Sequence, residues 1–168
     1  MSADLPPALS GQRFPMKADY PGVVNFTRAA ADVACGGATE IATLARLQRD
    51  GFRTIVNLRQ ATEAGADLDG HLAEARRLAL EHVHIPFDGQ RPEPQAVDRF
   101  LDVMADAGKF PVYVHCLSAN RVGAMWLAKR MLQDGCAMEP ALVEARTIGL
   151  KNAGLEAFML GYVAARRA

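Results

Sequence analysis

The chain has 168 residues, of which 50% are hydrophobic and 23% are charged. This length and composition exclude a disordered chain and suit one domain that buries its own core. The 19 basic and 19 acidic side chains cancel, which excludes an overall electrostatic attraction to nucleic acid or to an anionic membrane surface. Any anion would therefore have to be held by a local site.

No apolar run is long enough to span a membrane, and the N-terminal residues lack the basic start and apolar stretch of a secretory signal. We therefore expect a cytoplasmic protein with neither a nucleic-acid nor a membrane partner. The three cysteines, Cys35, Cys116 and Cys136, are too few and too scattered for a disulfide framework or a zinc site. They are expected to be free thiols, and whether Cys35 or Cys136 pairs with Cys116 stays open.

Residues 1–22 are rich in proline and are predicted to form an irregular arm, while residues 23–168 form the domain. Short apolar and β-branched runs predict strands at 31–35, 54–58, 83–85 and 111–115. Helical spacing and capping residues predict one helix that begins after Thr39 and another that begins near Asp69. A third helix is predicted from Pro94 to Gly108 and a fourth over 122–132, and two more helices follow before the C-terminus. The helix at 122–132 is apolar enough to lie at the centre of the domain.

Strands that alternate with helices predict a single α/β domain with a mostly parallel sheet of four or more strands flanked by helices. Ligands of such sheets bind at the carboxyl ends of the strands, where helix N-termini point. This rule directs attention to the turn that follows the predicted strand at 111–115.

That turn carries the sequence VHCLSANRVG over residues 114–123. Cys116 leaves the strand and Arg121 opens the helix. The residues whose backbone N–H groups could surround a tetrahedral anion are Leu117, Ser118, Ala119, Asn120 and Arg121. The helix dipole adds partial positive charge at the same place, and the planar guanidinium of Arg121 can donate hydrogen bonds to two oxygens at once. The same field favours the thiolate form of Cys116, so the turn predicts a site for phosphate or sulfate beside a nucleophile.

The stretch from about residue 25 to residue 133 also carries GG at 36–37, TIVNLR at 54–59 and HIPFD at 84–88. With these motifs it resembles the bacterial phosphatase-like "beta-lactamase-hydrolase-like" domains, relatives of the atypical dual-specificity phosphatases of plants and fungi. The resemblance implies a cysteine-phosphatase fold and hydrolysis of a phosphate monoester without metal or organic cofactor. It makes Cys116 the nucleophile, Arg121 the phosphate clamp and Asp88 the general acid. It also implies that His115 belongs to the phosphate-binding residues, hydrogen-bonds near the loop and helps to hold the thiolate.

Three features of this turn differ from those of most such phosphatases. Four residues separate Cys116 from Arg121 where five are usual, Ala119 replaces a loop glycine, and Val122 replaces a hydroxyl that assists the departing thiolate. The four-residue spacing also occurs in rhodaneses, so a sulfurtransferase that carries a persulfide on Cys116 is one alternative. Ala119 and Val122 favour another alternative, a phosphate-binding module without catalysis.

Other residues of the motifs allow simpler interpretations. Asp88 could serve only as a turn residue in FDG, and Arg59 and Arg91 are expected to be solvated rather than to line the site. His82 and His84 lack the further ligand that a metal site would need, so no metal is predicted. A protein, a phosphoinositide, an inositol phosphate and a small metabolite all remain candidate phosphorylated substrates.

Overall fold

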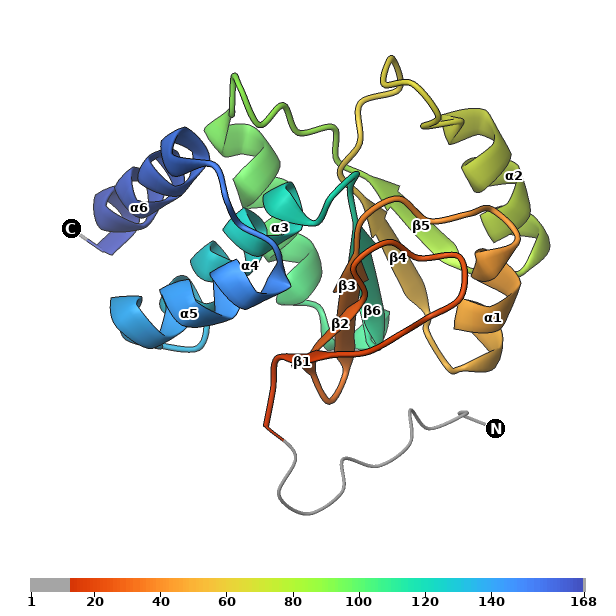
Figure 1. Cartoon of the computed structure of the whole chain (residues 1–168), viewed down its shortest axis with the longest axis horizontal. Helices are drawn as coiled ribbons and strands as arrows, with labels where there is room; N and C mark the ends of the chain where they lie inside the picture. The colour runs from red at the N-terminus through yellow and green to blue at the C-terminus, as the bar shows by residue number, and fades with distance from the viewer. Residues whose placement is uncertain (1–12, 168) are drawn as a thin grey trace.

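Strands and helices alternate along residues 13–167, the part of the chain that the computed structural model describes (Figure 1). The strands are β1 (Met16–Lys17), β2 (Thr27–Ala30), β3 (Val33–Gly36), β4 (Thr54–Asn57), β5 (Glu81–His84) and β6 (Val112–His115). The helices are α1 (Thr43–Arg49), α2 (Leu68–Arg77), α3 (Pro94–Met104), α4 (Asn120–Leu132), α5 (Met138–Ile148) and α6 (Ala153–Arg167), with a short 3-10 helix, η1, at Ala107–Lys109.

The strands form one sheet in the order β1-β2-β3-β6-β4-β5. The four strands β3, β6, β4 and β5 run parallel, and β1 and β2 add an antiparallel edge. Because β6 lies between β3 and β4, the segment that leaves its carboxyl end is flanked by the loops that leave both neighbours. The prediction of a single α/β domain with a mostly parallel sheet is confirmed.

Helices cover both faces of the sheet (Figure 1). On one face, α3, α4, α5 and α6 pack against Val56 and Val114 in the larger hydrophobic core. On the other face, Leu44 and Leu47 of α1 pack with Ile55 and Tyr113 in a smaller core. Most of α4 is buried, so the prediction that this helix is central is confirmed. No helix within residues 13–167 is both long and apolar enough to cross a lipid bilayer.

The main differences from the sequence predictions lie at the N-terminal side. The predicted irregular arm contains β1, which pairs with β2, and neither strand was expected because both are short and lack an apolar alternation. Residues 1–12 of that arm lie outside the described residues. The predicted strand at 31–35 begins two residues later, and the predicted helix from Pro94 ends at Met104, before η1 and Gly108.

Two predicted helix caps are wrong. The Thr39 hydroxyl donates to the carbonyl of Gly37 and pairs with the Tyr113 hydroxyl, while α1 begins at Thr43. Asp67, not Asp69, caps α2, and its carboxylate accepts from the N–H of Gly70 at 3.1 Å. Both residue types suit a cap, and the local sequence does not decide which of two neighbouring candidates is used.

Three histidines cluster at α2: His71 of this helix and His115 are buried, and His82 is half-buried. The rings of His71 and His115 stack with centroids 5.6 Å apart. Burial, followed by the neighbouring histidines, lowers the pKa of His82 to about 4 and that of His115 well below its usual value. Burial also lowers the pKa of His71. The cluster is therefore neutral at neutral pH.

Substitution of Gly123 tests the packing of α4 against α5. A Cβ at this position would lie 2.6 Å from the carbonyl oxygen of Ala145 and 2.8 Å from the backbone nitrogen of Leu150. We expect Gly123→Ala to lower the free energy of unfolding by about 1–3 kcal/mol, measured by urea denaturation. Gly161→Ala is the control, because no described atom lies within 4 Å of its Cβ, and it should stabilise by up to about 1 kcal/mol. Equal effects of the two substitutions would contradict this packing.

The histidine cluster predicts loss of stability in mild acid. An unfolded histidine binds a proton below about pH 6.5, whereas the folded cluster resists protonation, so stability falls as pH decreases through that value. His115 alone should remove up to about 1.7 kcal/mol from the free energy of unfolding between pH 6.5 and pH 5. Urea denaturation of His115→Gln should show a shallower pH dependence than the wild type, and His71→Asn provides the same test if the first variant does not fold. Parallel pH profiles would contradict the prediction.

Candidate active site

The loop between β6 and α4 holds the predicted nucleophile at the carboxyl edge of the sheet. The side chain of Cys116 is fully buried. Ala119 has φ 71° and ψ 6° and is the N-cap of α4. This is the left-handed conformation that glycine adopts easily and alanine only at a cost in energy, as the replacement of the family glycine by Ala119 led us to expect.

The backbone N–H groups of the loop are free to bind an anion. None of the N–H groups of residues 117 to 121 donates to an acceptor within residues 13–167. They lie in a left-handed turn and at the start of a thirteen-residue helix. Such a series of unpaired amides at a helix N-terminus favours an anion. The geometry is therefore consistent with the predicted phosphate loop.

Three oxygens of the loop, by contrast, accept hydrogen bonds from the surrounding structure. The carbonyl of Leu117 accepts from the N–H of Ala38 at 2.7 Å, and that of Ser118 accepts from the Asn25 side chain at 3.2 Å. The Asn120 side chain accepts from the N–H of Lys151 at 2.8 Å. These hydrogen bonds join the loop to the segments around it and help to maintain the strained turn at Ala119.

The guanidinium of Arg121 is held by two neighbouring loops. Its two terminal nitrogens donate to the Glu63 carboxylate at 2.7 and 2.8 Å, and one of them also donates to the carbonyl of Phe87 at 3.0 Å. Burial disfavours the charge of Arg121, but the Glu63 hydrogen bond and the nearby Cys116 outweigh this and raise its pKa. Arg121 therefore stays charged beside Cys116.

Glu63 was not identified from the sequence. Burial would raise the pKa of its carboxyl group, but hydrogen bonds from Arg121 and from the N–H of Gln60, together with nearby charge, lower it below its usual value. The same carboxylate pairs with Arg59 at 3.4 Å. The only signal in the sequence was an acidic residue in a polar loop shortly after a buried strand, and such residues are usually solvated.

Arg59 is buried, with 5% of its surface exposed, so the expectation that it is solvated is wrong. Its guanidinium donates to the carbonyl of Ala64 at 2.8 Å as well as to Glu63. The reason is tertiary, because the β4–α2 loop folds back over this side chain. Arg91, in contrast, is exposed as expected.

Asp88 lies on the loop that follows β5, next to Phe87, whose carbonyl binds Arg121. Its carboxylate accepts from the N–H of Gln90 at 2.9 Å. The fold thus brings the Asp88 loop to Arg121, as the resemblance implies. The bond to Gln90 is that of a turn residue, so the geometry accommodates the general-acid and the turn interpretations together.

His115 does not join the other predicted site residues. Side chains alternate across a strand, so Val114 packs in the larger core whereas His115 faces the other side, stacked on Tyr113 and His71. Its ring is buried and has no hydrogen-bond partner within residues 13–167. In this structure the His115 ring therefore lies behind the loop, and its predicted role among the phosphate-binding residues stays a prediction.

The remaining candidates, Cys35, Cys136 and Val122, lie outside the loop from Cys116 to Arg121. Cys35, Cys116 and Cys136 are free thiols in this structure, and burial raises the pKa of Cys35 to about 12. Val122 is buried in the core. No group of three or more histidine, cysteine, aspartate or glutamate side chains within residues 13–167 is arranged to hold a metal ion.

The comparisons with known proteins agree with this geometry. A family model described as "DSP-PTPase phosphatase fused to NAD+ Kinase" matches residues 24–156. A search of curated proteins found no match.

Solved structures share the fold at low sequence identity. A DUF442 protein from Shewanella putrefaciens CN-32 is 20% identical, with a TM-score of 0.73 and coverage of 86% of this chain and 92% of its own. TpbA from P. aeruginosa is 21% identical, with a TM-score of 0.67 and coverage of 90% and 89%. The core catalytic domain of SIW14 from S. cerevisiae is 15% identical, with a TM-score of 0.69 and coverage of 89% and 96%.

The family model spans most of the chain and includes the complete loop from Cys116 to Arg121. The solved structures show the same arrangement of sheet and helices. The comparisons give no support to the sulfurtransferase alternative. The chain therefore belongs to the family of DSP-PTPase phosphatases fused to NAD+ kinase, and its domain is a cysteine-dependent phosphatase of the dual-specificity type.

Proposed function

We propose that the domain hydrolyses phosphate monoesters through a phosphocysteine formed on Cys116. The observation that carries the proposal is the row of unpaired N–H groups at residues 117–121, which begins at the thiol and ends at the charged Arg121. Such a cradle stabilises the negative charge on the equatorial oxygens of a phosphoryl group during transfer. These residues are the ones proposed to bind phosphate.

Glu63 holds Arg121 in the orientation that this role needs. It takes one hydrogen from each terminal nitrogen of the guanidinium. Arginine has five N–H donors in a fixed fork, so Nε and the second hydrogen of one terminal nitrogen remain for phosphate oxygens. Glu63 is therefore a positioning residue, and it leaves the phosphate-binding edge of Arg121 free.

In the first step, the Cys116 thiolate attacks phosphorus, the sulfur–phosphorus bond forms, and the bond to the leaving oxygen breaks. Asp88 supplies the proton that the leaving oxygen needs. In the second step, water attacks the phosphocysteine, Asp88 accepts its proton, and the thiolate leaves with the electrons of the sulfur–phosphorus bond. Val122 has no hydroxyl to donate to that thiolate, so this second step is the slower one.

The ligands and descriptions of structural neighbours support a phosphorylated substrate but do not identify it. A variant of TpbA has been crystallised with pTyr, and SIW14, described as a PP-IP phosphatase, with citrate. At 19% and 15% identity, these ligands do not choose between a phosphoprotein, a phosphoinositide, an inositol phosphate and a small metabolite. Binding without turnover is the second candidate function, favoured by Val122 and by the strained Ala119.

Hydrolysis of p-nitrophenyl phosphate tests the proposal. We expect Cys116→Ser to reduce the rate by at least about a thousandfold, because serine is a poor nucleophile without an added base. Cys136→Ser, at a half-buried site away from the loop, is the control and should stay within about twofold of the wild type. Acid-quenched wild-type enzyme should carry one phosphate on Cys116, and rapid mixing should show a burst of nitrophenol.

Equal rates for wild type and Cys116→Ser would contradict the proposal. Vanadate binding without hydrolysis would favour the non-catalytic candidate, and cyanide-dependent turnover of thiosulfate would favour a sulfurtransferase.

The role of Asp88 is tested with leaving groups of different basicity. A phenolate with a nitro group leaves without much help, whereas an alkoxide needs a proton, so we expect Asp88→Asn to slow an alkyl phosphate by at least about a hundredfold and p-nitrophenyl phosphate much less. Asp106→Asn is a matched control, because Asp106 accepts from the N–H of Gly108 in the same kind of turn, in a loop away from the site. Equal losses on both substrates would assign Asp88 a purely structural role.

A further inference from the structure

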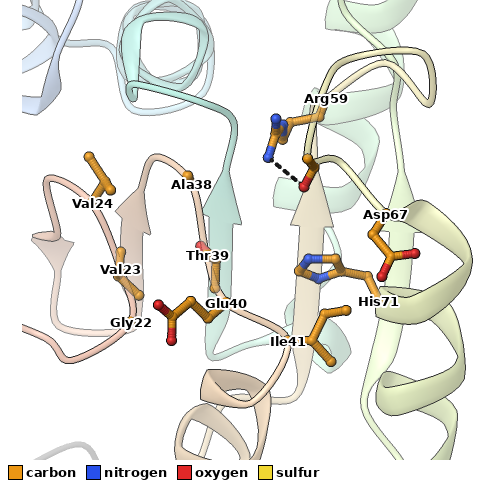
Figure 2. A pocket seen from close by; sticks show the side chains of 11 residues that line it. Gly22, Val23, Val24, Ala38, Thr39, Glu40, Ile41, Arg59, Asp67 and His71 are labelled. Atoms are coloured by element: carbon orange, nitrogen blue, oxygen red, sulfur yellow. Dashed lines mark hydrogen bonds between the residues drawn. The ribbon is translucent and has the colours of Figure 1, made fainter.

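A pocket of about 630 Å³ opens between the β3–α1 loop and the β4–α2 segment. Figure 2 shows Val24, Ala38 and Glu40 along one side and Arg59, Asp67 and His71 along the other. This volume suits a small organic group. The pocket lies at the carboxyl edge of the parallel strands, where the candidate active site is also located.

Two connections join this pocket to the phosphate loop. Ala38 in its wall donates to the carbonyl of Leu117, the residue after Cys116, at 2.7 Å. On the other side, Arg59 pairs with Glu63, which also holds Arg121. Exposed apolar side chains, Val24 and Leu117, lie at this junction, with 55% and 49% of their surfaces exposed. A phosphate ester bound in the loop would thus extend into the pocket over an apolar rim.

The charged residues of the pocket wall make it unsuitable for a second anion. The only cation among the lining residues is Arg59, whose guanidinium donates to Glu63 and to backbone carbonyls of the β4–α2 loop. Glu40 and Asp67 are exposed and carry negative charge. A phosphate group placed here would be repelled by both carboxylates, and Glu63 already offsets the charge of Arg59.

His71 adds a polar group for an uncharged ligand. Only 3% of this residue is exposed, and its Nδ1 has no hydrogen-bond partner within residues 13–167. Its ring projects from α2 toward the pocket (Figure 2). A buried polar group without a partner costs free energy, which a hydroxyl or amide of a bound group would recover.

We propose that this pocket receives the leaving group of the substrate, and that Glu40 and Asp67 select phosphate monoesters whose leaving group carries no second phosphate. The preferred leaving group is uncharged and partly apolar, such as a phenol, and polyphosphorylated polyols are rejected. This inference rests on the proposed phosphatase activity and narrows its substrate class.

The double variant Glu40→Gln/Asp67→Asn tests the selection. Both changes keep side-chain size, and asparagine can still cap α2. We expect kcat/KM for inositol hexakisphosphate to rise at least tenfold relative to kcat/KM for phenyl phosphate, while the latter changes less than about threefold. Asp102→Asn/Glu139→Gln removes the same charge from exposed positions on α3 and α5 and should leave the ratio unchanged. A rise of the same size in this control would show that the overall charge of the protein, rather than the charge of the pocket, sets the preference, and it would overturn the proposal.

Isothermal titration calorimetry, which measures binding, provides an independent test of the proposed selection. With Cys116→Ser in both proteins to prevent turnover, protein with the wild-type pocket should bind phenyl phosphate but not inositol hexakisphosphate at the same concentration, and protein with Glu40→Gln/Asp67→Asn should bind both. An unchanged preference in the variant, with normal hydrolysis of phenyl phosphate, would overturn the pocket proposal and leave the phosphatase proposal standing. A preference of the wild type for inositol hexakisphosphate would do the same. Absence of Cys116-dependent hydrolysis of any of these esters would instead refute the phosphatase proposal.

Discussion

The guanidinium of Arg121 joins three loops that leave adjacent parallel strands. Glu63 belongs to the loop after β4, Phe87 to the loop after β5, and Arg121 itself to the segment after β6. Each loop alone has several accessible conformations, but one partly buried, charged group with fixed donor directions restricts all three. The positions of Cys116 and of the Asp88 loop therefore depend on the same ion pair that keeps Arg121 charged.

The strained turn at Ala119 is tolerated because its surroundings determine it. An L-residue in the left-handed region costs about 1–2 kcal/mol. Hydrogen bonds from Asn25, Ala38 and Lys151 to oxygens of the loop favour this conformation. Gly149 packs closely against this turn, because a Cβ added to it would lie 2.9 Å from the backbone of Ala119. The N–H groups of residues 117–121, which have no acceptor within residues 13–167, follow one another through this turn and into the start of α4.

Charge in this protein is arranged locally rather than globally. The whole chain has a formal net charge of zero, so an anion gains nothing from approach to the surface in general. The loop carries Arg121, which is paired with Glu63, and the α4 N-terminus, whereas the adjacent pocket carries Glu40 and Asp67. An ester with one phosphate and an uncharged leaving group fits both regions together.

The sequence by itself determined the α/β class, the central apolar helix, and the turn in which Cys116 and Arg121 are five positions apart. These features depend on local periodicity and on residues close together in the chain. Only the tertiary structure decided that Glu63, 58 residues from Arg121 in the chain, holds the guanidinium and that Arg59 is buried under its own loop. It also decided that His115 faces away from the site and that β1 and β2 complete the sheet. Such contacts join segments that are distant in the chain, and an isolated acidic or basic residue looks the same in sequence whether it faces water or a buried partner.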